Sequence, residues 1–582
     1  MSHDLSFFKQ PGAEPAGSSA SAPMPPPAVA LTLGSPRFAD ARRAACARER
    51  GAAAAWQAAF ASGDPLSAAA AVGGDFAVGL RDASGHSFMA VDRFAIRSLC
   101  YRIDAGELRF SARADQLAGP GAELDPQAIF DYLYFHCIPS PRTIFKGVYR
   151  LPPGHCATFD RGALVVEPYW QPAFDEPRRA AFEPLREEFR ELLRAAVTRQ
   201  LGGSAKPACF LSGGTDSSTL AGMIGQVSGR GAATYSIGFE AAGYDEMEFA
   251  RIAARRFDCE HHEYYVTPAD LVRSIGDVAA SFDQPFGNSS ALPAYYCARM
   301  AADDGVSKLL AGDGGDELFG GNSRYAKQRI FGWYGDVPAS LRHRLLEPLL
   351  GRPGVARVPL LRKGASYVEQ ARVPMPDRLQ MYNLLLRLGP AAVLAPGFLD
   401  QVRIDAPAEQ QREVWAQARA DSAVNRTLAY DWRYTLAESD LPKVCGATQL
   451  AGIGVGFPLL DDDLLAFSMR LPPEYKLKGL TLRWFFKEAL RGFLPEAIIK
   501  KKKQGFGLPF GVWVNRDPAL QQVAFAALRS LGSRGIVRSD FIHTLIETHL
   551  PAHPGYYGEM VWILMALEHW LQRHAPDYSA PT

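Results

Sequence analysis

The feature that most constrains the fold of this chain is a glycine-rich turn between a predicted strand and a predicted helix. Residues 208–211 (ACFL) have the pattern of a short buried strand, and residues 218–229 (STLAGMIGQVSG) have that of a helix. Two adjacent glycines within residues 212–218 (SGGTDSS) allow the chain to turn sharply between them. Because the first N–H groups of a helix are unpaired and lie at the positive end of its dipole, the turn predicts an anion site.

The side chains of this turn favour a pyrophosphate group as the anion. Ser212, Ser217 and Ser218 add hydroxyl donors, and Asp216 lies among them. The segment contains no Gly-Lys-Ser/Thr, so it is not a Walker loop, and its glycine spacing is not that of a dinucleotide-binding turn. The alternative is a plain glycine-rich turn with a serine cap. The flanking strand and helix and the presence of Asp216 favour the pyrophosphate site.

A second glycine-rich segment, residues 311–321 (AGDGGDELFGG), carries three acids, Asp313, Asp316 and Glu317. Mg²⁺ in proteins is commonly held by one or two carboxylates together with phosphate oxygens, so these acids favour a Mg²⁺ site beside the pyrophosphate. A solvated acidic turn is the alternative interpretation.

Strands alternate with helices around these two segments. Residues 234–239, 261–266 and 308–312 are further predicted strands, and residues 244–257 are a predicted helix. Such alternation is typical of a parallel sheet with helices on both faces. The chain from about residue 325 to 582 is predicted to be mostly helical.

The first third of the chain has a different character. Residues 1–37 are predicted to form a flexible arm, because their Pro, Ala, Gly and Ser content cannot bury enough apolar surface. Residues 38–72 are predicted to be helical, and the short β-like runs that follow, up to about Trp170, indicate an antiparallel domain. The predicted domains are therefore 38–175 and 184–582.

Composition excludes several classes of protein. The 582 residues carry 63 Lys and Arg against 62 Asp and Glu, and 47% are hydrophobic, which excludes a disordered chain. The near-zero net charge lacks the excess of positive charge that is typical of proteins that bind nucleic acid or an anionic membrane. No apolar run approaches the roughly 18 residues that span a bilayer, and no signal peptide is visible. Eight cysteines without a CxxC pair predict a reduced, cytoplasmic protein.

The sequence SGGTDSS matches the SGGxDSS loop of ATP pyrophosphatases, the PP-loop, and residues 311–321 resemble the GEGxDELFGGY box of B-type asparagine synthetases. Residues 234–266, 282–296 and 457–514 resemble further motifs of that family in the same order, so the resemblance covers about residues 74–570. It implies a multidomain α/β and α+β fold. An antiparallel β-rich, amidotransferase-like domain would precede a parallel-sheet PP-loop ATP pyrophosphatase domain with a helical C-terminal part.

The resemblance implies ATP and Mg²⁺ as cofactors and a ligase that adenylates a carboxylate, releases pyrophosphate, and forms an amide and AMP. It implies that Asp216 and Asp316 bind Mg²⁺ and that Asp313 acts in acyl-adenylate formation. Arg483 stands where the family has a lysine that steadies developing charge, and Lys487, one helical turn away, is a substitute for it. The implied pyrophosphate contacts are Ser212, Gly213, Gly214, Asp216, Ser217 and Ser218, and the implied adenosine contacts are Leu211, Ile237 and Gly312. The basic run at 500–503 is either a solvated face or a pyrophosphate clamp.

The N-terminal half departs from the family where glutamine would be hydrolysed. Family members begin Met-Cys-Gly and use the cysteine as nucleophile, whereas this chain has Ser2, a weaker nucleophile. Ala95 and Ser98 replace the glycine and proline of a DRFGIxPL box, Arg113 replaces a glutamate that faces glutamine, and the first strands of the domain are expected to be missing. We therefore expect no glutaminase activity, with ammonia or an amine as the nitrogen donor.

The synthetase half departs as well. Cys445, Gly446 and Gly456 replace an aspartate and two arginines of the family, which predicts a more open site for a larger or less charged acyl group. The substrate is then a small-molecule or peptide carboxylate, and a macrolactam-forming enzyme like the lasso-peptide cyclases is an alternative. A catalytically inactive scaffold is a further alternative, and a homodimer stays open.

Overall fold

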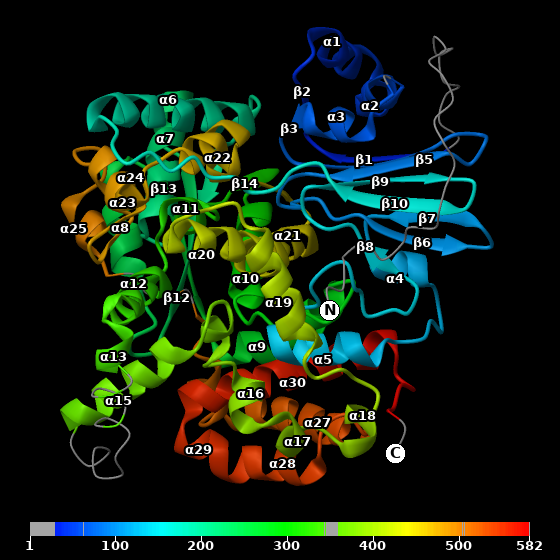
Figure 1. The fold of residues 1–582 in the computed structure, drawn as a ribbon, viewed down its shortest axis with the longest axis vertical. Coiled ribbons are helices and arrows are strands. Elements are labelled where there is room, and N and C mark those ends of the chain that lie inside the picture. The colour runs from blue at the N-terminus through cyan, green and yellow to red at the C-terminus, as the bar shows by residue number, and fades with distance from the viewer. Residues whose placement is uncertain are drawn as a thin grey trace. The chain divides into compact units, whose positions relative to one another are not determined.

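The computed structural model describes residues 29–61, 63–342, 344, 348, 359–502, 505 and 507–580 (Figure 1). The chain divides into two compact units. Unit 1 extends to Gln171 and includes Phe282–Phe286 and Ala437–Pro442, while unit 2 contains Pro172–Ser281, Gly287–Leu436 and the chain from Lys443 onward. Each unit has its own sheet.

Unit 1 is built on a five-stranded antiparallel sheet in the order β1-β4-β5-β9-β10. Residues alternate between its two faces: Phe76 and Val78 belong to one buried cluster and Ala77 to another, as the twofold period of a strand requires. The first cluster also contains the fully buried Trp56. The elements of unit 1 are β1 Val29–Gly34, β2 Arg37–Phe38, α1 Ala41–Arg50, α2 Ala52–Phe60, α3 Pro65–Ala70, β3 Val72–Gly73, β4 Phe76–Arg81, β5 Ser87–Val91, β6 Cys100–Asp104, β7 Glu107–Ser111, α4 Ala114–Ala118, α5 Pro126–Phe135, β8 Tyr149–Arg150, β9 His155–Asp160 and β10 Ala163–Pro168.

Strand β1 corrects two expectations. It lies within the predicted arm over 1–37, yet its six residues pair with β4 from Arg81 to Phe76. The alternating Leu31 and Leu33 of β1 pack against a buried cluster, which fixes the register of the strand. The arm prediction was therefore wrong for residues 29–34, and the domain does have a strand ahead of β4. Residues 1–28 lie outside the described part of the chain.

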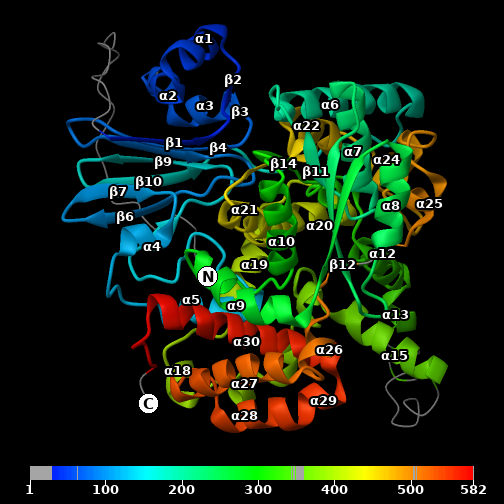
Figure 2. The ribbon, with the colours of Figure 1, turned by 180° about the vertical axis from the view of Figure 1, so that it is seen from behind.

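Unit 2 contains a five-stranded parallel sheet in the order β13-β12-β11-β14-β15. Its strands are β11 Ala208–Phe210, β12 Ala233–Phe239, β13 Glu260–Val266, β14 Lys308–Leu310 and β15 Gly454–Gly456. The first four confirm the predicted strands, and β15 was missed because a glycine-rich run of three residues gives no strand signal. Tyr235 of β12 and Ala298 of α10 share one buried cluster, while α7 and α8 lie on the other side of the strands (Figure 2).

Helices make up most of the rest of unit 2, as predicted. Those used below are α6 Phe182–Leu201, α7 Thr215–Ser228, α8 Met247–Arg256, α9 Pro268–Ser281, α10 Ala291–Asp303, α11 Gly315–Phe319, α12 Ser323–Asp336, α21 Leu441–Leu450, α24 Trp484–Ala489, α25 Glu496–Lys500, α27 Pro518–Ser533 and α30 Pro554–His574. Helix α7 begins three residues earlier than predicted, at Thr215. Within the described part of the chain, no helix combines the length and the apolarity that crossing a membrane requires.

Candidate active site

The SGGTDSS turn has the predicted strand–turn–helix conformation. Strand β11 ends at Phe210, and Gly214 is the N-cap residue of α7. Gly213 has φ 65°, a left-handed conformation that favours glycine, and a β-carbon there would overlap the backbone nitrogen of Ala250 in α8. The turn therefore presents the start of a 14-residue helix at the carboxyl edge of the parallel sheet, as an anion site requires.

The serines of the turn have different surroundings. The backbone N–H of Ser212 donates to Oγ of Ser217 at 3.1 Å, and the two hydroxyl oxygens lie 3.1 Å apart. The hydroxyl of Ser218 is fully buried and has no hydrogen-bond partner among the described residues. Of the three predicted donors, Ser212 is exposed to solvent, and Ser217 is hydrogen-bonded to Ser212. The side chain of Ser218 is buried in the interior instead.

The residues expected to contact adenosine come together at the same sheet edge. Leu211 follows β11 and its N–H donates to the carbonyl oxygen of Tyr235 in β12, the strand that also carries Ile237. Gly312 follows β14, and a β-carbon there would lie 3.1 Å from the backbone nitrogen of Ser217. Three neighbouring strands of a parallel sheet thus place these residues around the turn, where open α/β sheets bind ligands.

Two of the predicted carboxylates share one guanidinium. Nη1 of Arg483 lies 2.9 Å from Oδ2 of Asp216 and 2.6 Å from Oδ1 of Asp316, and Nη2 of Arg483 bonds to Oδ1 of Asp216. The side chain of Arg483 is 7% exposed. Burial lowers the pKa of Arg483 to about 9, which still leaves it protonated at neutral pH. The guanidinium and the carboxylates meet in space although Arg483 and Asp216 are 267 residues apart in sequence.

Glycines surround these carboxylates because no side chain fits there. A β-carbon at Gly315 would overlap Oδ1 of Asp216, and one at Gly321 would overlap Oδ1 of Asp316. Two carboxylates at the edge of a phosphate-binding turn form a donor set that suits Mg²⁺ when phosphate oxygens complete the coordination. Asp216 and Asp316 therefore fit the cation that the sequence predicts.

The remaining predicted catalytic residues have contrasting surroundings. Nζ of Lys443 in α21 lies 3.8 Å from Oδ1 of Asp313, a pairing that the sequence prediction missed. Lys487 in α24 is half-buried, and its backbone N–H donates to the carbonyl oxygen of Arg483 at 3.0 Å, whereas its side-chain Nζ has no hydrogen-bond or ion-pair partner among the described residues. Burial first, and then the charge of Arg483, lower the pKa of Lys487. Lys487 is therefore a cation available to a ligand, whereas Arg483 is already engaged.

In the described part of the basic run, residues 500–502, Lys501 contacts the turn, while Lys503 lies outside the described residues. Lys501 is 9% exposed, and its Nζ lies 2.9 Å from Oε1 of Glu246, 3.4 Å from the carbonyl oxygen of Ser212 and 3.3 Å from that of Gly213. Lys500 is 75% exposed and pairs with Glu496. The solvated interpretation therefore fits Lys500, and a role at the turn fits Lys501.

We expect Lys501→Met to raise the KM for ATP about tenfold, because charge-assisted hydrogen bonds that hold the turn are lost. The circular dichroism spectrum should be unchanged. Steady-state AMP release over a range of ATP concentrations measures the effect. Lys500→Met is the matched control, with an expected change below about twofold since an exposed ion pair contributes little. Equal effects of both substitutions would contradict a specific role for Lys501.

The structure corrects the expectation that Gly456 opens the acyl site. A β-carbon at Gly456 would overlap Oε1 of Gln200 and lie 2.7 Å from Cε of Lys308. Nζ of Lys308 bonds to Oε1 of Gln200 at 2.9 Å, so these two side chains fill the space beside β15. The space beside Gly456 is therefore filled by the side chains of Gln200 and Lys308, and glycine at this position does not widen the pocket.

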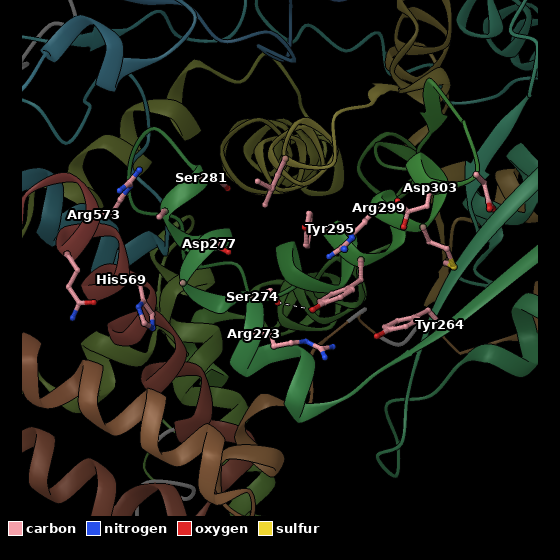
Figure 3. A pocket seen from close by; sticks show the side chains of 17 residues that line it. Tyr264, Arg273, Ser274, Asp277, Ser281, Tyr295, Arg299, Asp303, His569 and Arg573 are labelled. Carbon is pink, nitrogen blue, oxygen red and sulfur yellow. Dashed lines mark hydrogen bonds between the residues drawn. The ribbon is translucent and has the colours of Figure 1, made fainter.

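A cavity of about 1320 Å³ lies elsewhere in unit 2. Helices α9, α10 and α30 supply most of its lining, including Arg273, Tyr295, Arg299, His569 and Arg573 (Figure 3). None of the predicted site residues lines it. The chemistry that points to ATP therefore lies on the loops at the carboxyl edge of the sheet and not in this cavity.

In unit 1, the structure shows the surroundings of two positions, Arg113 and Ala95, at which the sequence departs from a glutaminase. Arg113 pairs with Asp115 at 2.7 Å, and the N–H of Ala114 donates to Oδ2 of Asp283 at 2.9 Å. Ala95 has φ 50°, so the backbone keeps the conformation in which the family has glycine. The fold of the box is thus retained while the charge at Arg113 is reversed.

Unit 2 has the sheet, turn and paired carboxylates of a PP-loop ATP pyrophosphatase, and it follows an antiparallel domain. The family model described as asparagine synthase matches residues 188–572, and that described as a glutamine amidotransferase domain matches residues 59–170. The chain belongs to the asparagine synthase family and is an ATP-dependent carbon–nitrogen ligase.

Similar proteins agree with this assignment. Asparagine synthetase [glutamine-hydrolyzing] 1 of Bacillus subtilis is 24% identical over 489 residues, which cover 83% of this chain and 74% of that protein. A putative asparagine synthetase [glutamine-hydrolyzing] of Mycobacterium bovis is 25% identical over 502 residues, covering 83% and 74%. Amidase chry2 of Gibberella zeae is 28% identical over 279 residues, covering 43% and 40%.

Proposed function

We propose that this protein activates a carboxylate with ATP and Mg²⁺ and joins it to ammonia or to an amine from another molecule, without hydrolysing glutamine. The observation that carries the proposal is the contrast between the two units. In unit 2, Asp216 and Asp316 converge beside the SGGTDSS turn. In unit 1, Arg113 stands paired with Asp115 where the resemblance expects a glutamate.

The turn, the two carboxylates and Lys487 have separate roles in this reaction. When bound, ATP supplies the adenylyl group that makes the acyl carbon electrophilic, and Mg²⁺ offsets phosphate charge. The start of α7, with Ser212 and Ser217, binds the pyrophosphate, and Asp216 and Asp316 hold the metal. Lys487 offers a cation to the negative charge that develops on the leaving group.

The acyl substrate that fits best is a carboxylate other than free aspartate. Cys445 and Gly446 carry no charge where the family has an acid and an arginine, which removes groups that would orient a small zwitterion. A carboxylate within a peptide, closed onto an amine of the same peptide to give a macrolactam, is the second candidate.

The test is AMP and pyrophosphate release from Mg²⁺–ATP with aspartate plus ammonium, compared with a panel of peptides that carry Asp or Glu side chains. The proposal expects release with members of the panel and amide formation detected by mass spectrometry. Aspartate-dependent AMP with formation of asparagine would overturn the substrate class. Folded protein that binds ATP but releases no AMP with any of the carboxylates tested would favour the inactive scaffold.

We expect glutamine to support amide formation at least about a hundredfold less well than ammonium at pH 8, because Arg113 puts a positive charge where the resemblance expects a glutamate facing the amine of glutamine, and like charges repel. Glutamate release from glutamine measures this directly. Ser2→Ala should leave the background rate unchanged. Glutamate production that disappears in Ser2→Ala would contradict the expectation.

A further inference from the structure

The predicted metal site of this chain contains a cation of its own. Both carboxylate oxygens of Asp216 and one oxygen of Asp316 accept N–H groups of Arg483. Two carboxylates held this close repel one another unless a positive charge lies between them. The guanidinium therefore provides in the free protein the neutralisation that a bound divalent ion would provide in the complex.

The backbone holds Arg483 in this place. Its N–H donates to the carbonyl oxygen of Lys476 at 2.9 Å, and its φ of 55° is a left-handed conformation at the start of α24. The guanidinium carbon lies 4.5 Å from the centre of the Phe486 ring, so one face is covered. A residue kept in an unfavourable backbone conformation and packed on one side is positioned by the fold and not by chance contact.

A divalent ion and this guanidinium compete for the same oxygens. Mg²⁺ binds carboxylate oxygens at about 2.0–2.1 Å, a distance that brings it next to the N–H groups already bonded to them. The two cations also repel one another, and more strongly in a site with little water than in bulk solvent. Free Mg²⁺ must therefore displace Arg483 from at least part of the pair.

We propose that Arg483 is a resident counter-cation that keeps the Asp216–Asp316 pair assembled and gives way when the metal arrives together with the phosphates of ATP. This inference rests on the proposed function to the extent that a divalent metal belongs at this pair. Binding of the metal alone is then weak, because it breaks hydrogen bonds of Arg483 to the two carboxylates and offers the guanidinium no other anion in their place. Binding with nucleotide is favourable, since phosphate oxygens add ligands for the metal and a new anion for the arginine. Arg483 is a positioning residue in this account.

Titration with Mn²⁺ alone, followed by the electron paramagnetic resonance signal of the free ion, tests the proposal without ATP or acyl substrate. We expect Arg483→Met to bind Mn²⁺ at least about tenfold more tightly than wild type, because a competing unit charge is removed from the pair. The melting temperature of Arg483→Met should fall in EDTA and recover with Mn²⁺, while that of wild type should change little. The double variant Arg483→Met, Asp216→Asn should lose the gain in affinity.

Two further variants keep the test decisive. Arg483→Lys retains a charge with a single ammonium, so it should fold even where Arg483→Met does not, and its affinity for Mn²⁺ should lie above that of wild type. Arg534→Met removes another buried arginine, one that pairs with Glu568 at 2.7 Å, and should leave metal binding unchanged. Mn²⁺ affinities of Arg483→Met and Arg483→Lys equal to wild type would overturn the inference. Failure of the proposed function would instead appear as absent AMP release, which this titration does not measure.

Discussion

Replacing Asp216 by asparagine is expected to lower the rate of AMP formation about a thousandfold while leaving the fold intact. Asparagine has the same shape, so the contacts of the SGGTDSS turn are retained, but one of the two negative charges that fit Mg²⁺ is lost. Removing a single preorganised electrostatic contact to the reacting groups typically costs a factor of about 10²–10³ in rate. The neutral amide also releases Arg483 from its bidentate partner, which adds to the loss.

The measurement is AMP release with the carboxylate that gives the highest rate in wild type, alongside circular dichroism and the melting temperature. Asp258→Asn is a matched control, because Asp258 is exposed and has φ 50°, a conformation that asparagine tolerates. Its rate should stay within about twofold of wild type. A rate for Asp216→Asn that is close to wild type would refute the assignment of the metal site.

The local part of this site could be predicted from the sequence because it is encoded locally. A strand, two glycines, serines and a helix within residues 208–229 define the turn, and the structure has them in that order. Strand β1 was missed for a different reason: Val29–Gly34 follows a proline-rich segment, and composition averaged over the whole segment hides the alternation of Leu31 and Leu33.

The contacts that complete the site could not be predicted because they join residues far apart in sequence. The sequence places Arg483 at a position that the family reserves for a cation, but only the fold shows that it bonds to Asp216 and Asp316. Lys501 meets the carbonyl oxygen of Ser212 across 289 residues. Such pairings depend on where α24 and α25 pack, which no local pattern encodes.

Alanine at Gly321 is expected to lower AMP formation at least about a hundredfold. Gly321 follows α11, and its N–H donates to the carbonyl oxygen of Asp316 at 2.8 Å, which holds the backbone in place. A β-carbon there would overlap Oδ1 of Asp316 and lie 2.6 Å from Cδ of Arg483. The methyl group must therefore push the Asp316 carboxylate out of the pair, and a misplacement of about 1 Å at a catalytic group can cost about 10²-fold in rate.

The matched control is alanine at Gly332, in α12, where a β-carbon meets nothing within 4 Å. Because alanine is the better helix former, Gly332→Ala should raise the free energy of unfolding by up to about 1 kcal/mol and leave the rate unchanged. Parallel AMP assays and thermal melts separate the two effects. Gly321→Ala with a rate within about threefold of wild type would show that the Asp316 carboxylate can move without loss, and Asp316 would then not be a metal ligand.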